Sequence, residues 1–131
     1  MTRIWLILTI IWLGILLLIN VNGNFPLNDD WQYAYAVKSL IENGTLTYRG
    51  QFSPIVLVQV LWGALFCKIT IGSFSFTALR WSILVLVPLL VGSVLKLGMK
   101  FSLSQKALII LGVGLFTTPL VMALAPSFMS D

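Results

Sequence analysis

The sequence contains little charge. Asp, Glu, Lys and Arg make up only 9% of its 131 residues, whereas a soluble domain has about a quarter. Hydrophobic residues account for 59% of the chain, and its mean hydropathy is +1.01. This composition excludes an ordinary soluble domain and predicts an integral membrane protein.

Histidine and cysteine, two residue types common in enzyme active sites, are absent and nearly absent, respectively. The chain has no histidine, which excludes His-based catalysis and the usual histidine ligation of metals. Cys67 is the only cysteine, which excludes an intramolecular disulfide and a cysteine-rich metal site. We therefore expect no metal and no cofactor, and acid–base chemistry must rest on the four acids. These are Asp29, Asp30, Glu42 and Asp131.

The eight Lys and Arg residues are scattered along the chain. They form no patch of the kind that tracks phosphates, so we expect no nucleic-acid partner. Their positions are instead informative about topology, because cytoplasmic loops of membrane proteins carry an excess of Lys and Arg.

Three apolar segments are suited to cross a bilayer, which requires about 17–25 residues. They cover residues 4–21, 77–97 and 106–125. We interpret the first as a signal anchor rather than a cleaved signal peptide, because its apolar run is long and the following NVNGNF offers no small-residue cleavage site.

A fourth apolar stretch, residues 55–71, is more difficult to assign. Short apolar runs of this kind are more often interfacial or re-entrant than spanning. If it crosses the membrane, Lys96, Lys100 and Lys106 all lie outside; if it does not, they join Arg3 on the cytoplasmic side. The second layout satisfies the positive-inside rule, so we predict that this stretch does not cross.

The predicted fold is therefore an all-α, polytopic membrane protein with three transmembrane helices and a cytoplasmic N-terminus. Residues 22–76 form one long outer-face loop, and the residues after Pro126 emerge on the same face. The chain ends in LVMALAPSFMSD, with no polar tail after its last apolar segment. We therefore expect it to be a truncated piece of a longer polytopic protein, in the inner (plasma) membrane of a bacterium.

Two helices are predicted within the outer loop. Asn28 or Asp29 can cap the first, and Gly44 can end it. Its apolar face is expected to carry Tyr33, Val37, Leu40 and Ile41, and its polar face Gln32, Ser39 and Glu42. Such a helix lies at the membrane interface. The second begins near Pro54 and ends near residue 71.

In this topology Asp29, Asp30 and Asp131 all lie at the outer membrane boundary. Acids near lipid are costly unless they are paired or functional. The simpler alternative is that Asp29 and Asp30 only cap a helix and that Asp131 has no role.

The stretch after the first apolar segment reads DDWQYAYAVKSLIENG. It has two adjacent acids, an aromatic residue (Tyr33) three positions after the second acid, and a helical pattern that ends in glycine. It resembles the first outer loop of the GT-C membrane glycosyltransferases, in particular the protein O-mannosyltransferases and the bacterial aminoarabinose transferase of lipid A. Those proteins carry an Asp-Glu pair at this place.

Two later segments resemble the same family. FTALRWSILVLVPLLVGSVLKLG is similar to its second transmembrane helix, which begins with an Arg after a small residue and ends in basic residues at the cytosol. APSFMSD is similar to its Ser-rich segment after the third helix, which ends in an outer-face Asp. The resemblance covers essentially the whole chain, so residues 1–131 look like the N-terminal portion of a GT-C-like transmembrane domain. It also implies that residues 54–71 form a loop helix.

The resemblance implies a function, namely transfer of a sugar from a polyprenyl-phosphate-linked donor to an acceptor hydroxyl at the outer membrane face. In such enzymes the first acid of the pair is the general base, a role that falls by position on Asp29, with Asp30 beside it as the second catalytic residue. The donor and membrane lipids are the expected partners, and the acceptor is not specified. The substrate-binding residues expected are Tyr33, Arg49, Arg80 and Asp131.

Arg49 and Arg80 are the candidates for accepting the charge of the leaving phosphate. The alternative for both is an arginine that snorkels or sets topology. The sequence also departs from the family pattern. Asp30 stands where the family has Glu, and Phe52 and Ser53 stand where it usually has a basic residue and the first of two prolines.

Two other functions remain open. The chain can be a small non-enzymatic membrane protein, such as an assembly partner or a remnant, or a transporter fragment. Transporters place ionisable groups near the membrane midplane, whereas the predicted spans here lack interior charge, which makes the transporter the weakest of the three. We expect the isolated 131-residue chain to be inactive.

Overall fold

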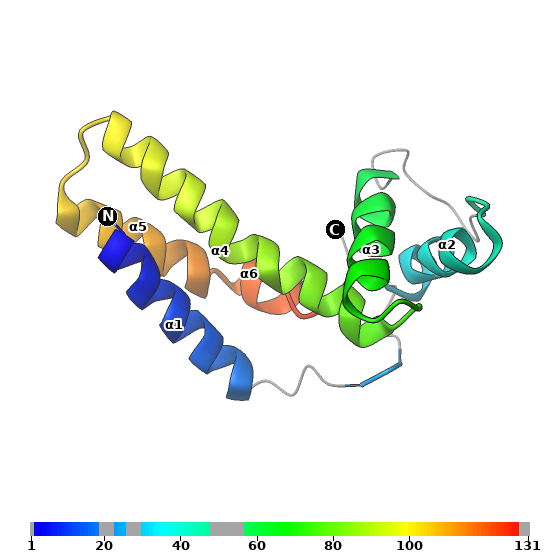
Figure 1. Ribbon diagram of the computed structural model, residues 1–131. Coiled ribbons are helices and arrows are strands. Elements are labelled where there is room, and N and C mark those ends of the chain that lie inside the picture. Colours follow the sequence, from blue (N-terminus) through cyan, green and yellow to red (C-terminus); the bar gives the residue numbers. More distant parts are fainter. Residues whose placement is uncertain (1, 19–22, 26–29, 48–56, 129–131) are drawn as a thin grey trace.

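The computed structural model describes residues 2–18, 23–25, 30–47 and 57–128. Every regular element in these ranges is a helix, which confirms the predicted all-α class for this part of the chain (Figure 1). The helices are α1 (Thr2–Leu18), α2 (Asp30–Asn43), α3 (Leu57–Thr70), α4 (Phe76–Lys100), α5 (Gln105–Thr117) and α6 (Pro119–Leu124).

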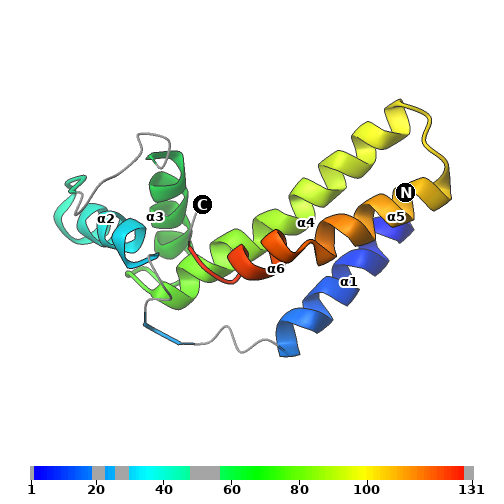
Figure 2. The same ribbon diagram turned by 180° about the vertical axis from the view of Figure 1, so that it is seen from behind.

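Helices α1, α4 and α5 pack side by side, with α1 and α5 running in one direction and α4 in the other (Figures 1 and 2). The parallel register of α1 and α5 is fixed by two contacts. Leu8 packs on Gly112, and one turn further the rings of Trp12 and Phe116 lie 5.4 Å apart. Small residues at such contacts let helix backbones approach closely.

Helix α4 has 25 residues and is the one described helix long and apolar enough to cross a membrane. Helices α1 and α5 are apolar but shorter, with 17 and 13 residues. The first predicted segment, 4–21, is helical up to Leu18, and its remaining residues lie outside the described part. The structure therefore supports membrane association through α4.

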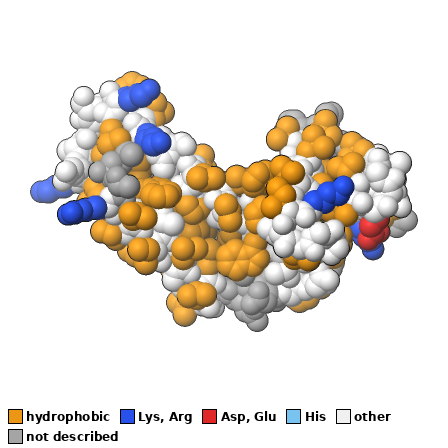
Figure 3. Space-filling view, in the orientation of Figure 1, with side chains coloured by type: hydrophobic (Ala, Val, Ile, Leu, Met, Phe, Trp, Pro, Cys, Tyr) orange, Lys and Arg blue, Asp and Glu red, His pale blue; other side chains and the backbone are white. Residues whose placement is uncertain are grey.

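The outer surface of the helix bundle is rich in exposed apolar side chains (Figure 3). Ile10 is 65% exposed, Leu17 is 85% exposed, and Leu89 and Leu90 on α4 are more than half exposed. Soluble proteins rarely expose contiguous apolar patches on this scale. The pattern is the one expected of helices surrounded by lipid.

The third predicted segment, 106–125, is divided into α5 and α6. Thr118 has φ −55° and ψ 128°, and Pro119 begins α6. A proline clashes with a helical conformation of the residue before it but suits the first position of a new helix, which explains the break. Pro88 behaves differently and lies inside an uninterrupted α4. Its carbonyl oxygen accepts a hydrogen bond of 2.9 Å from Trp5 Nε1, which joins α1 to α4.

Helices α2 and α3 confirm the two helices predicted within residues 22–76, and they pack against each other beside the start of α4 (Figure 1). Val37, expected on the apolar face of α2, is fully buried, and Tyr33, Leu40 and Ile41 are partly buried in the same cluster. Gly44 follows α2 with φ +68°, a conformation that suits a glycine stop. Helix α2 thus buries its apolar face in protein.

Ser39 corrects the predicted polar face of α2, because it is only 5% exposed. Its hydroxyl donates to Thr47 Oγ1 at 3.0 Å and lies 3.4 Å from Thr45 Oγ1. The chain turns back after Gly44 and brings these two threonines over the helix. A buried hydroxyl with hydrogen-bond partners carries little penalty, which is why a serine tolerates this position.

Candidate functional site at the start of helix α4

The six predicted site residues are described to different extents. Tyr33 and Arg80 are fully described, and Asp30 is the first residue of α2. Asp29, Arg49 and Asp131 lie outside the described residues. The predicted meeting of the acids therefore stays a prediction.

Arg80 is the best-defined predicted site residue. It lies in the second turn of α4 and is only 1% exposed. Its Nη1 donates to the carbonyl oxygen of Gly23 at 2.9 Å, and its Nη2 donates to the carbonyl oxygen of Phe25. The guanidinium carbon also lies 5.3 Å from the centre of the Phe25 ring. Carbonyl dipoles and an aromatic face both stabilise a cation out of water, so a buried Arg is tolerated here.

The same short segment also caps α4. The backbone N–H of Phe76 donates to Asn24 Oδ1 at 2.9 Å. One residue earlier, Ser75 is the N-cap, and its hydroxyl accepts from the Ala78 N–H at 3.4 Å. A helix start leaves N–H groups without partners inside the helix, and here two separate parts of the chain supply them. Residues 23–25 are thereby fixed against the first two turns of α4.

These contacts bear on how Arg80 could act. Each terminal nitrogen of its side chain donates to a backbone carbonyl, and the two hydrogen bonds restrain the guanidinium against Gly23 and Phe25. Full burial argues against the snorkelling alternative considered from the sequence, and the contacts with Gly23 and Phe25 give the arginine a structural role. That role positions the segment directly before the acidic pair, and phosphate binding by Arg80 stays a prediction.

Tyr33 lies on α2 among the partly buried residues of the cluster that α2 shares with α3 and α4. Its backbone position, one turn after Asp30, is consistent with the sequence pattern that singled it out. Fully buried Ala34, Ala36 and Val37 follow directly along the helix and anchor it.

The C-terminal part of the described chain is anchored nearby. Phe128 is fully buried and fills the space beside Gly63, where an added Cβ would come within 2.6 Å of its ring. Gln59 Nε2 donates to the carbonyl oxygen of Phe128 at 3.3 Å. The same Cβ on Gly63 would approach Leu79 Cδ2 to 2.8 Å, so α3, α4 and the chain end meet at this glycine.

Leu79 and Arg80 are therefore adjacent attachment points for two distant parts of the chain. Leu79 belongs to the cluster that holds Phe128, and Arg80 holds Phe25. The sequence did not identify this junction. In the sequence the junction corresponds to a glycine in α3 and to the stretch Asn-Gly-Asn-Phe before the acids. Neither feature indicates which distant residues it contacts.

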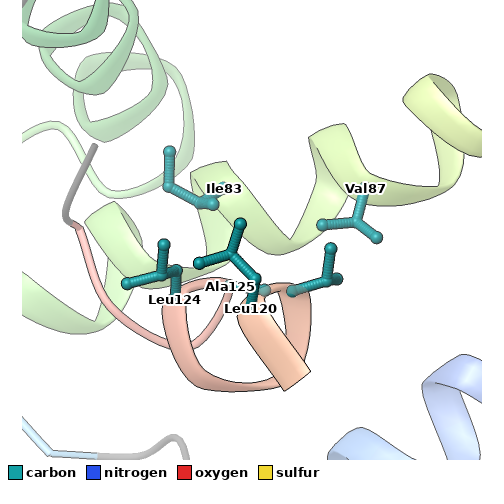
Figure 4. Close-up of a pocket in the computed structure, with 6 residues that line it drawn as sticks. Ile83, Val87, Leu120, Leu124 and Ala125 are labelled. Carbon is teal, nitrogen blue, oxygen red and sulfur yellow. The ribbon is translucent and has the colours of Figure 1, made fainter. Parts of the chain in front are cut away.

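Two shallow apolar hollows lie along α4. The first has a volume of about 180 Å³ and is shown in Figure 4; it is lined by Ile83, Val87, Leu120, Val121, Leu124 and Ala125. The second shares Ile83 and Val87 with it, has a volume of about 460 Å³, and includes a single polar residue, Ser93. Linings of this composition suit hydrocarbon and offer nothing to bind the sugar or phosphate of a substrate.

Cys67 carries the only thiol of the chain and is fully buried. Burial raises the pKa of the Cys67 thiol above its ordinary value. Its sulfur lies 3.8 Å from the carbonyl oxygen of Ser75. Since the thiolate is the reactive form, this geometry makes Cys67 a packing residue and a poor nucleophile.

Within the described ranges, no group of three or more His, Cys, Asp or Glu residues could hold a metal ion. No protein-family model, curated protein or solved structure matches the chain. A functional conclusion must therefore start from the residues and their geometry.

Proposed function

We propose that this chain is part of an integral membrane glycosyltransferase that takes a sugar from a polyprenyl-phosphate donor and transfers it to an acceptor hydroxyl at the outer membrane face. The observation that carries the proposal is the anchoring of Phe25 at Arg80 and of Phe128 in the cluster of Leu79, at adjacent positions of α4. Phe25 precedes the pair Asp29–Asp30 by four residues, and Phe128 precedes Asp131 by three.

Covalent geometry makes this anchoring relevant. Each residue extends a chain by at most about 3.6 Å, so four residues reach at most about 14 Å from Phe25 and three reach at most about 11 Å from Phe128. A site built from Asp29 and Asp131 requires that both acids follow closely after residues held at neighbouring positions of α4. The resemblance to GT-C glycosyltransferases leads to the same pair of segments independently of the geometry.

The directions of the helices support a three-crossing arrangement. Helices α1 and α5 run antiparallel to α4, so Arg3, Lys96, Lys100 and Lys106 all lie toward one end of the bundle (Figure 1). Helices α2 and α3 lie toward the other end. Helix α3, with 14 residues, spans only about 21 Å, less than the roughly 30 Å of a bilayer core. Helix α5 has 13 residues, but α6 continues the chain directly after Thr118. We propose a multi-pass protein of a bacterial plasma membrane with its active face outward.

In the proposed reaction Asp29 accepts the proton of the acceptor hydroxyl, and the resulting oxygen attacks the anomeric carbon of the sugar. The bond between that carbon and the phosphate oxygen breaks, and the electron pair leaves with polyprenyl phosphate. Arg49 and Arg80 are the two candidates for accepting the charge of the leaving phosphate. Arg80 also fixes residues 23–25, which precede Asp29 in the sequence.

The test uses the full open reading frame that contains residues 1–131, expressed in membranes. Transfer is measured from polyprenyl-phosphate mannose and polyprenyl-phosphate aminoarabinose. Asp29→Asn is expected to abolish transfer while insertion into the membrane persists. Glu42→Gln is the matched control, because Glu42 lies on the same outer loop, is exposed and makes only a 4.0 Å ion pair with Lys38.

Retained transfer in Asp29→Asn would rule out the assigned base. A reading frame that ends at Asp131 would instead favour the small non-enzymatic membrane protein. Many further apolar segments after Asp131 would support the enzyme, because members of this type enclose the lipid donor with additional helices.

A further inference from the structure

The end of the bundle opposite α2 and α3 carries a group of cations at one level. Leu8 on α1 and Leu95 on α4 both approach Gly112 on α5, within 2.5 Å and 3.5 Å of where its Cβ would lie. These three residues therefore lie at the same level along the axis of the bundle.

Three cations lie at nearly equal distances beyond that level. Arg3 precedes Leu8 by five residues, Lys100 follows Leu95 by five, and Lys106 precedes Gly112 by six. Because a helix rises about 1.5 Å per residue, all three backbones lie about 7.5–9 Å further toward the same end. Lys96 is about one turn deeper and can extend its side chain to this level.

We call Arg3, Lys96, Lys100 and Lys106 the basic end. All four side chains are exposed. In the part of the chain that the structure describes, the one ion pair between side chains joins Lys38 and Glu42 on α2. Figure 3 shows blue side chains gathered over the tips of α4 and α5, and red only at the opposite lobe on that face. The basic end therefore has a net positive charge that no described carboxylate neutralises.

The turn between α4 and α5 holds Lys100 and Lys106 in fixed relation. Ser102 adopts φ 57°, and the Leu103 N–H donates to the Gly98 carbonyl at 3.1 Å, which closes α4 in a Schellman-like turn. Ser104 then caps α5, accepting from the Ala107 N–H at 3.3 Å. The two lysines are presented on an ordered hairpin.

Apolar side chains continue from the basic end along the outside of α4. Leu97 is 53% exposed and Leu90 is 57% exposed, while Phe101 in the turn is 74% exposed. A molecule that occupies this surface meets cations at the tip and hydrocarbon-like side chains below. That combination matches a phosphate headgroup with acyl chains attached and does not match a free phosphate ion.

We propose that the basic end binds the headgroups of anionic phospholipids in the cytoplasmic leaflet. Clusters of Lys and Arg directly beside a transmembrane helix are attracted to anionic lipid. This site lies at the end of the bundle opposite α2, which carries Asp30 and Glu42, so it is separate from the site proposed for sugar transfer. It rests on insertion of α4 in the membrane and on the proposed topology, which places the basic end in the cytoplasm.

The experiment uses the 131-residue chain reconstituted in phosphatidylcholine bilayers that contain a trace of spin-labelled lipid. Electron spin resonance measures how much spin-labelled phosphatidylglycerol, relative to spin-labelled phosphatidylcholine, is immobilised at the protein. We expect phosphatidylglycerol to be preferred about fivefold or more, and the preference to decline strongly in 1 M NaCl, where the screening length is about 3 Å.

The variant K96Q/K100Q/K106Q is expected to reduce the ratio to near one. The matched control K38Q/K68Q removes two exposed lysines from the opposite lobe and should leave the ratio unchanged. K96R/K100R/K106R keeps the charge and should keep the preference. If K96Q/K100Q/K106Q does not fold, the phosphatidylglycerol preference of the wild type and its dependence on salt still test the proposal.

Three outcomes would overturn the site. They are a wild-type ratio of one, an equal loss in K38Q/K68Q, and displacement of spin-labelled phosphatidylglycerol by inorganic phosphate at matched ionic strength. The last would show that the basic end recognises phosphate without its lipid. None of these outcomes depends on glycosyltransferase activity.

Discussion

Arg80 holds Phe25 in two ways: its Nη2 donates to the backbone carbonyl of Phe25, and its guanidinium carbon lies 5.3 Å from the centre of the Phe25 ring. Fifty-five residues separate the two in sequence. A buried arginine joined to a backbone in this way restrains the segment before the acidic pair, because a planar guanidinium with two directed donors fixes orientation as well as distance.

Arg80→Lys is expected to weaken this restraint. A lysine provides one ammonium group in place of the planar fork, so at least one of the carbonyls of Gly23 and Phe25 loses its donor. Hydrogen bonds to charged groups contribute about 1.5–3 kcal/mol, and we expect the free energy of unfolding to drop by about that amount. Hydrogen exchange at Phe76, whose backbone N–H donates to Asn24 Oδ1, should accelerate. Arg3→Lys, at an exposed site, is the control and should change neither quantity.

Two glycines in α5 allow a matched test of helix packing. A Cβ at Gly112 would lie 2.5 Å from Leu8 Cδ1, whereas a Cβ at Gly114 would meet nothing within 4 Å. Gly112→Val should therefore separate α1 from α5 and lower the free energy of unfolding by about 1–3 kcal/mol. Gly114→Val should have little effect. Equal free energies of unfolding for Gly112→Val and Gly114→Val, measured by denaturation in detergent, would contradict the described register of α1 against α5.

Sequence patterns predicted the local elements well. The apolar spacing along residues 33–41 and the glycine after Asn43 correctly indicated α2, and the short apolar run near Pro54 indicated α3. Both depend on neighbours within a few residues, which is the range over which periodicity and capping act. The Thr118–Pro119 break was not predicted, because the apolar run over residues 106–125 indicates one helix, although a proline disfavours a helical residue before it.

The contacts that define the candidate site could not be predicted from such local patterns. Ser39 is buried because Thr45 and Thr47 lie over it, which requires the chain to turn back after α2. Arg80 is bound by backbone carbonyls, and any residue type provides a carbonyl, so no sequence signal marks Gly23 and Phe25 as its partners. Such contacts depend on tertiary packing.

Burial of Cys67 predicts a pH dependence of stability. Because the folded-state pKa of this thiol is raised, the stability it contributes is present below the unfolded-state pKa and is lost as pH rises through the folded-state pKa. An unfolded thiol titrates near pH 8.5, so the decline begins at about that pH. The free energy of unfolding of the wild type should decrease more steeply above it than that of Cys67→Ala. Parallel curves of the free energy of unfolding against pH for the two proteins would show that burial does not raise the pKa of Cys67.

Membrane sidedness can be tested with single cysteines placed at Thr47 and Ser102 in a Cys67→Ala background. Both positions are exposed, one on the lobe of α2 and α3 and the other in the turn between α4 and α5. In intact cells or right-side-out vesicles, a membrane-impermeant maleimide should label Thr47→Cys. It should reach Ser102→Cys only after the membrane is opened, because the proposed topology places that turn with Lys100 and Lys106 in the cytoplasm. Labelling of Ser102→Cys from outside would contradict the proposed topology, because it would place the lysines of the basic end on the outer face.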